Sequence, residues 1–162
     1  MQDNSDFFRK IALRQQALRE YSHERFTVAD CYAGTGEITQ HYWSIAAQQV
    51  LCIEQHQDKA RHISGANVTV KIGRNVDFLA EIIACDVIDC DAYGLVMPFV
   101  RKLKQAGGSS KLIIFTDGTP EKGRKVYSAF KTFKTNLDDL FSTVTYELSN
   151  AGNAYYGYGY LK

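Results

Sequence analysis

The sequence predicts an α/β fold in which a doubly wound, mostly parallel sheet of seven strands carries helices on both faces. Strand-like apolar runs alternate with helix-like runs along most of the 162 residues, a pattern typical of a parallel sheet covered on both sides. The length suits one domain with a substantial core. Two strand-like runs with no helix between them close the chain. One strand is therefore predicted to run antiparallel to the others.

The elements are predicted in order from their apolar periodicity and their turn residues. A first helix over residues 5–21 has Ser5 as its cap and an apolar stripe along one side. Strands 27–33, 49–55, 68–72, 86–91 and 110–116 then alternate with helices 36–48, 57–64, 75–84, 95–106 and 120–134. Strands 141–148 and 154–161 form the closing hairpin. We predict one domain, 1–162, made of an N-terminal helix (1–25), a βα core (26–134) and the hairpin (135–162).

Composition and charge limit the classes of function. The formal net charge of +1 gives no global argument for nucleic-acid binding, although a local basic face is compatible with it. No apolar run approaches the length of a membrane span, and the first residues lack an apolar signal segment, so we expect a cytoplasmic protein without membrane contact. The cysteines lie mostly in apolar runs and lack metal-ligand spacing with histidines, which predicts buried reduced thiols and no metal site. They are Cys31, Cys52, Cys85 and Cys90.

The most informative stretch is residues 30–36, Asp-Cys-Tyr-Ala-Gly-Thr-Gly. A β-branched run precedes it and a helix-like run follows it, and strand, glycine turn and helix together let the backbone approach a nucleotide-like ligand closely. Eighteen residues after Gly36, Glu54 closes a second apolar run. A carboxylate at the end of the neighbouring strand can accept hydrogen bonds from ribose hydroxyls. The two features together predict an adenosine-type ligand, and a purely structural glycine turn is the alternative.

The identity of that ligand follows from two details of the stretch. A dinucleotide fingerprint needs a third glycine where this chain has Thr39, so a nicotinamide-linked oxidoreductase is disfavoured. Asp30 suits a cationic ligand better than a pyrophosphate, and S-adenosylmethionine carries an ammonium and a sulfonium. The stretch resembles the first motif of class I S-adenosylmethionine-dependent methyltransferases, in the variant with an aromatic third residue found in DNA and RNA methyltransferases. The resemblance covers nearly the whole chain and implies the strand order 3-2-1-4-5-7-6.

A second constellation ends the fourth predicted strand. Residues 91–94, Asp-Ala-Tyr-Gly, resemble the catalytic motif of amino-group methyltransferases, closest to the Asp-Pro-Phe-Gly form of tRNA guanine-N2 methyltransferases. A carboxylate that accepts N–H bonds makes an exocyclic base amine more nucleophilic, and an aromatic face holds the base by stacking. Ala92 departs from the motif, since proline is usual there. The alternative is structural: Asp91 would cap the next helix and Tyr93 would pack against it.

After the third predicted strand, Arg74 stands where the resemblance implies an acidic residue. Asn75 or Asp77 is then the candidate to contact the adenine amine, with a helix cap as the alternative. Cys90 precedes Asp91 within the strand, which favours a buried thiol over a covalent nucleophile. The predicted catalytic residues are Asp91 and Tyr93. The predicted cofactor-binding residues are Asp30, Tyr32, Ala33, Gly34, Thr35, Gly36, Glu54, Gln55, Asn75 and Asp89.

The predicted activity is S-adenosylmethionine-dependent methyl transfer to a nitrogen, with an exocyclic amine of a nucleic-acid base, RNA in particular, as the favoured acceptor. A small-molecule methyltransferase and a catalytically inactive, methyltransferase-like binding subunit are the alternatives, and a protein partner or homodimer is compatible with each. A basic helix could meet phosphates, although a solvated face is favoured; its cations are Lys122, Arg124, Lys125, Lys131 and Lys134. The tyrosine-rich last strand is predicted to pack against the first helix.

Overall fold

The computed structural model describes residues 6–21, 24–118, 124–149 and 152–162, which form a single seven-stranded sheet in the order β3-β2-β1-β4-β5-β7-β6. The predicted fold class and strand order are confirmed. Neighbouring strands from β3 to β5 run parallel, and β7 runs antiparallel to both β5 and β6. The strands are β1 (Thr27–Asp30), β2 (Gln49–Glu54), β3 (Val68–Ile72), β4 (Val87–Asp91), β5 (Leu112–Gly118), β6 (Phe141–Leu148) and β7 (Ala154–Leu161).

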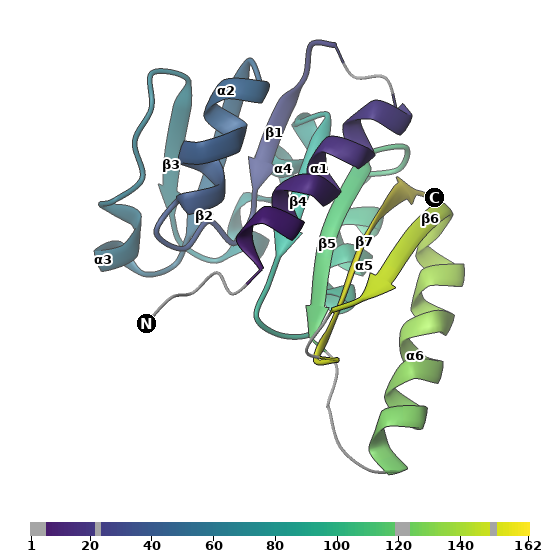
Figure 1. Cartoon of the computed structure of the whole chain (residues 1–162). Helices are drawn as coiled ribbons and strands as arrows, with labels where there is room; N and C mark the ends of the chain where they lie inside the picture. Colours follow the sequence, from purple (N-terminus) through teal and green to yellow (C-terminus); the bar gives the residue numbers. More distant parts are fainter. Residues whose placement is uncertain (1–5, 22–23, 119–123, 150–151) are drawn as a thin grey trace.

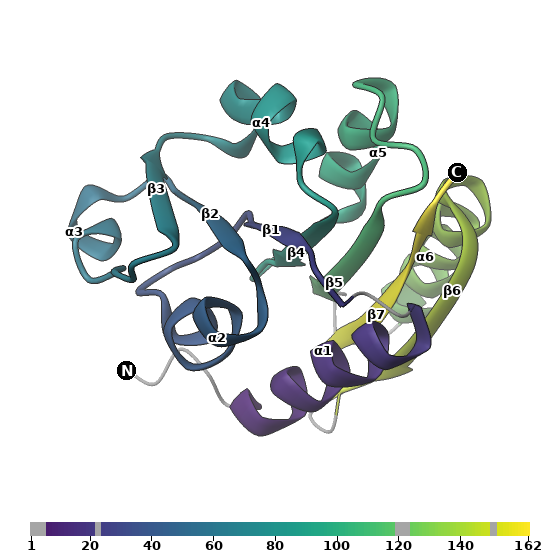
Figure 2. The same ribbon diagram turned by 90° about the horizontal axis from the view of Figure 1, so that it is seen from above.

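Helices cover both faces of this sheet (Figures 1 and 2). On one face lie α4 (Leu79–Ala84), α5 (Met97–Gln105) and α6 (Arg124–Leu140). On the other lie α1 (Phe7–Tyr21) and α2 (Ser44–Ala46), while α3 (Gln57–Ala60) sits near the β3 edge. A core cluster fills each side of the sheet, and the near-continuous apolar sequence of β4 and β5 reflects burial on both faces.

Several helices depart from their predicted bounds. The predicted helix 36–48 contains a π-helical turn, η1 (Thr39–Trp43), and gives way to extended backbone at Ala47. The predicted helix 57–64 ends at Ala60, because the amides of His62 and Ile63 bond three residues back and form turns. The predicted helix 120–134 extends to Leu140, because Phe133, Leu137 and Leu140 continue its buried apolar stripe. Strand β6 begins at the next residue. The predicted cap Ser5 lies outside the described residues.

The first helix and the last strand pack together, as predicted. Tyr158 of β7 is fully buried and meets Tyr21 of α1 edge to face, and the Tyr158 hydroxyl donates to Glu20. Glycines alternate with these tyrosines, and an added Cβ at Gly157 would lie 2.4 Å from the ring of Phe115. Phe115 therefore packs against the glycine side of β7, and Tyr156 and Tyr158 on the other side belong to the hydrophobic core.

The four cysteines are buried and form no disulfide, in agreement with the sequence-based expectation. Among the described residues, no helix combines the length and apolar character needed to cross a membrane. Within the same part of the chain, no group of three or more His, Cys, Asp or Glu residues is arranged to hold a metal ion.

Candidate functional site

Two recesses adjoin one another at the carboxyl ends of the parallel strands, where doubly wound sheets bind ligands. The larger has a volume of about 600 Å³ and lies against the ends of β2 and β3 and the start of α5. The smaller, of about 190 Å³, extends toward α1, β5 and β7. The residues that line both recesses form the junction between them: Tyr32, Gly34, Lys59, Ala92 and Tyr93.

The glycine loop after β1 is tied to the acidic residue that ends β2. The Gly34 N–H donates to Glu54 Oε2 at 2.9 Å, and the His56 N–H donates to Glu54 Oε1 at 2.8 Å. Each carboxylate oxygen keeps a further lone pair for a hydroxyl in the larger recess. Gly34 has φ +57°, and a Cβ there would meet no atom within 4 Å. The loop therefore leaves open space beside Glu54, as a closely approaching ligand needs.

Asn75 supplies the clearest sign of a missing partner. Its side chain lines the larger recess, and among the described residues its Oδ1 is the one buried side-chain polar atom without a hydrogen-bond partner. Such atoms are rare because desolvation without a partner is costly. A carboxamide matches the donor and acceptor pattern along an adenine edge. The other predicted candidate, Asp77, instead pairs with exposed Arg74 and lines neither recess. The residues around the larger recess thus fit an adenosine.

Asp30 lies beneath the recesses and lines neither of them. It is 3% exposed and accepts a hydrogen bond of 2.6 Å from the Thr39 hydroxyl. Burial, together with the nearby Asp89 carboxylate, raises the pKa of Asp30 to about 7. Thr39, which replaces the third glycine of a dinucleotide fingerprint, therefore serves to anchor this carboxyl group below the glycine loop.

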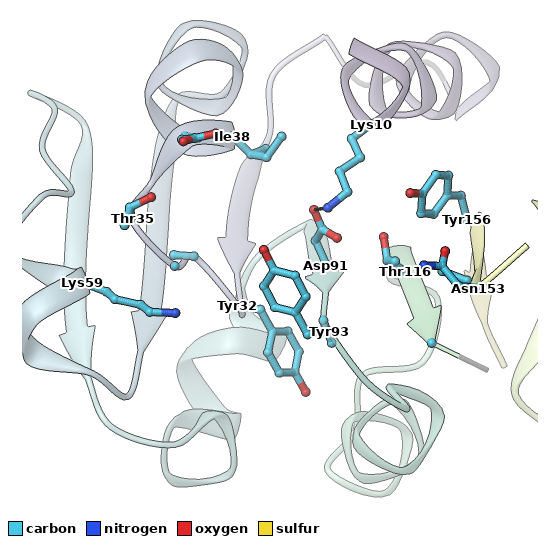
Figure 3. A pocket seen from close by; sticks show the side chains of 16 residues that line it. Lys10, Tyr32, Thr35, Ile38, Lys59, Asp91, Tyr93, Thr116, Asn153 and Tyr156 are labelled. Atoms are coloured by element: carbon cyan, nitrogen blue, oxygen red, sulfur yellow. Dashed lines mark ion pairs between the residues drawn. The ribbon is translucent and has the colours of Figure 1, made fainter. Parts of the chain in front are cut away.

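Asp91 ends β4 in the smaller recess, where Lys10 of α1 reaches its carboxylate (Figure 3). Lys10 Nζ lies 2.9 Å from Asp91 Oδ2, and Arg14 Nη2 lies 3.4 Å from the same oxygen. Burial alone would raise the pKa of Asp91, but Arg14 and Lys10 outweigh it and hold that pKa below its usual value. Thr116 also hydrogen-bonds this carboxylate. Asp91 is thus a fixed anion that accepts hydrogen bonds, and it is a weak base.

The segment after β4 is held from β5. The Gly118 N–H donates to the Gly94 carbonyl, and Asp117 Oδ2 accepts from the Val96 and Met97 amides at the start of α5. The cap of that helix is therefore provided by Asp117, and the hypothesis that Asp91 caps it is wrong. These bonds fix the loop although residue 92 is alanine. Tyr93 is 76% exposed at the junction of the recesses, so it does not pack against α5.

Asp89 is also removed from the recesses. Its carboxylate is 1% exposed and accepts from both Arg14 and the Trp43 indole N–H, the latter at 2.6 Å. The predicted residues thus separate into two sets. Those that line a recess are Tyr32, Ala33, Gly34, Thr35, Glu54, Gln55, Asn75, Asp91 and Tyr93. Those that support the site from outside the recesses are Asp30, Gly36 and Asp89.

Sequence reasoning missed three cations at the site. Lys10 and Arg14 come from α1, sixteen or more residues before the glycine loop, and Lys59 comes from α3. Each belongs to a helix with an otherwise ordinary polar face. The one available signal was charge balance, because three neighbouring strand-end aspartates require positive partners when they are buried.

No protein-family model matches the chain, and no curated protein matches it either. Solved structures do resemble it. The candidate hemolysin of Lactococcus lactis is 17% identical, with a TM-score of 0.67 over 95% of this chain and 87% of that one. The candidate methyltransferase yhhF of Escherichia coli is 16% identical, with a TM-score of 0.64 over 99% and 87%. TYW2 of P. horikoshii, solved with MeSAdo, is 17% identical, with a TM-score of 0.59 over 93% and 62%.

At these identities the likeness concerns the fold, and the sheet order, the reversed β7 and the position of the recesses agree with it. The chain therefore has a class I methyltransferase-like Rossmann fold.

Proposed function

We propose that this protein binds S-adenosylmethionine at the junction of the two recesses and transfers its methyl group to a nitrogen, with an exocyclic amine of an RNA base as the favoured acceptor. One observation carries the proposal: a recess that fits an adenosine, with Glu54 and the unpartnered Oδ1 atom of Asn75, opens beside a recess that holds Asp91. The cofactor would supply an electrophilic methyl group on sulfur. The side chains of this protein would bind the cofactor and orient the acceptor.

In the larger recess, the Glu54 carboxylate would accept the ribose hydroxyls and Asn75 would pair with the adenine edge. Gly34 permits close approach of the backbone between these groups and the smaller recess. The similar TYW2 structure is a complex with MeSAdo, which favours an adenosine compound as the ligand of such a fold. Tyr32 and Gln55 also line the larger recess, and Ala33 and Thr35 line the smaller one.

In the smaller recess, Asp91 would accept an N–H bond from the acceptor amine and orient its lone pair toward the methyl group. Alignment of donor and acceptor contributes much of the acceleration in such a displacement. Because the pKa of Asp91 is held low, this carboxylate orients the amine, and the proton released from the methylated nitrogen passes to water. Tyr93 offers an exposed ring on which a base can stack, which supports a nucleic-acid acceptor.

RNA is preferred over DNA and over small molecules because residues 91–94 resemble the motif of tRNA guanine-N2 methyltransferases. The cytoplasm is the corresponding compartment, in keeping with four buried, unpaired cysteines.

Calorimetric titration with S-adenosylmethionine is the first test, with NAD as the control ligand. We expect micromolar affinity for the former and none for the latter, and we expect Glu54→Ala to abolish binding. Transfer of labelled methyl from S-adenosylmethionine to RNA, DNA and amine metabolites then identifies the acceptor. Asp91→Asn should keep cofactor affinity and lower turnover by about 100-fold or more, since it removes the oriented carboxylate. Unchanged turnover in that variant would remove Asp91 from the mechanism.

A catalytically inactive binding subunit is the second candidate, and the Lys10–Asp91 ion pair favours it. In this arrangement the protein's own ammonium occupies one side of the carboxylate that an acceptor amine needs. If the protein binds S-adenosylmethionine and methylates no acceptor, alone or with a co-purified partner, this second function replaces the first.

A further inference from the structure

We propose that Lys59 binds the carboxylate of the methionine portion of S-adenosylmethionine. This inference rests on the proposed function, because it assigns a residue to one part of that cofactor. Nothing in the motifs of the sequence points to Lys59, which lies in the short helix α3 after β2.

The position of Lys59 sets it apart from the other cations of the site. It is partly buried and lines both recesses, and Figure 3 shows its side chain reaching toward the junction from the side opposite Lys10. Within the described part of the chain, the Lys59 ammonium has neither an ion pair nor a hydrogen bond. A partly desolvated ammonium with no partner is a ready site for an anion.

The remaining cations around the recesses are either paired or more remote. Lys10 pairs with Asp91, and Arg74 pairs with Asp77. Lys102 has no ion pair to a described residue, but it lines only the larger recess, on the side formed by α5. Among the described residues, Lys59 is therefore the cation at the junction whose ammonium can bind an anionic ligand.

The geometry of the cofactor brings its one anionic group to this junction. With adenine at Asn75 and ribose at Glu54, the methyl group must face Asp91 in the smaller recess. The amino-acid branch then extends from the sulfur along the glycine loop, where Gly34 adjoins both recesses and Thr35 lines the smaller one. Asp30 lies outside both recesses, Glu54 is held by the Gly34 and His56 amides, and Asp91 is paired with Lys10 and Arg14. A cofactor carboxylate beside the branch would therefore meet Lys59.

The matched ligand pair for a test is S-adenosylmethionine and its decarboxylated form, which differ only in the carboxylate. Calorimetry gives the affinity of the wild-type protein, of Lys59→Met and of Lys59→Arg for both ligands. Lys59→Met should weaken the binding of S-adenosylmethionine by about tenfold or more, since a hydrogen bond between charged groups is lost. It should leave the affinity for the decarboxylated form unchanged, and Lys59→Arg should restore most of the loss.

Lys102→Met is the control for general charge at the rim, and we expect it to change both affinities equally or not at all. An equal effect of Lys59→Met on the two ligands would overturn the assignment of Lys59 while leaving the cofactor in place; Lys59 would then serve another anion, such as a phosphate of the acceptor. Absence of binding by the wild-type protein would overturn the cofactor and this assignment together. Thermal unfolding of each variant separates these outcomes from a folding defect.

Discussion

Arg14 and Asp89 form a two-pronged ion pair in the interior of the protein, with Nε–Oδ2 and Nη2–Oδ1 distances of 2.7 and 2.9 Å and both side chains 1% exposed. Burial opposes the charge on Arg14, but the carboxylates of Asp89 and Asp91 outweigh it and raise the pKa of the guanidinium. The first helix is thereby joined to the central strand β4, whose last residue, Asp91, lines the smaller recess.

Replacing Arg14 by methionine should destabilise the protein strongly. The substitution leaves Asp89 charged, buried and short of a partner, which costs about 3–5 kcal/mol. Chemical denaturation measures the free energy of unfolding. The double variant Arg14→Met with Asp89→Asn should recover part of the loss, because the uncompensated charge is gone. Arg74→Met removes an exposed pair and should leave stability unchanged. A small effect of Arg14→Met would mean that water reaches Asp89.

Asp30 should make the protein less stable as the pH rises. Its folded-state pKa of about 7 exceeds the usual value, so folding favours the protonated form. That contribution is complete below the unfolded-state pKa of about 4 and disappears as the pH rises through 7. The side chain of Asp30→Asn cannot ionise, so this variant should gain stability relative to the wild type as the pH rises from 5 to 8.

Unfolding midpoints measured at several pH values test this, with both proteins in the same buffers. Parallel pH profiles of wild type and Asp30→Asn would show that Asp30 ionises normally, with Arg14 as its counter-charge.

Alanine substitutions at Gly34 and Gly36 should have different effects: one should mainly lower ligand affinity and the other should mainly lower stability. At Gly36 the φ is +84° and the new Cβ would lie 2.9 Å from Ile63 Cγ1, so Gly36→Ala should lose about 2–4 kcal/mol of stability. At Gly34 the Cβ would point into open space, so Gly34→Ala should lose only the backbone strain of about 1–2 kcal/mol. The affinity of Gly34→Ala for S-adenosylmethionine should fall, because the alanine side chain would occupy part of the space that the ligand needs.

Thermal unfolding and calorimetry distinguish the two variants. Equal stability losses with unchanged ligand affinity in Gly34→Ala would contradict the position given to the cofactor.

Tyr93→Ala should impair the acceptor and spare the fold. The ring is 76% exposed, so its removal should leave the unfolding midpoint unchanged. Loss of base stacking costs about 1–3 kcal/mol, which corresponds to a KM for RNA raised by about 5- to 150-fold. Tyr93→Phe keeps the ring and should behave as the wild type. An RNA KM that does not change in Tyr93→Ala would favour a small amine as the acceptor.

The sheet could be predicted from the sequence because its strands are continuous apolar runs separated by glycine and polar turns, as in Val50–Ile53 before Glu54. Helix ends were less predictable: nothing in the sequence near residue 60 marks the end of α3, since its residues are adequate helix formers. Asn75 could be proposed from its place after β3, but its unpartnered oxygen is a property of the packed structure.

The partners of the aspartates could not be predicted, because they depend on contacts between distant parts of the chain. Asp30 was expected near the cationic groups of the ligand, and the structure gives it Thr39 as a partner below the loop. Arg14 and Lys10 lie seventy-five and eighty-one residues from Asp89 and Asp91, and helical periodicity alone does not reveal which cation of a helix turns inward. Local patterns specify elements, whereas charge pairing is decided by their packing.

The contact of α1 with both β4 and β7 bears on how the chain acquires its structure. Because α1 precedes β4 and β7 in the chain, it finds its ionic partner only after β4 has been synthesised and its aromatic partners only after β7 has followed. Such contacts between remote segments slow folding, and they delay it until most of these residues have left the ribosome. Until then Arg14 remains in water, and the smaller recess has no wall on the α1 side. The nascent protein should therefore gain ligand-binding competence in one late step, when α1 packs against β4 and β7.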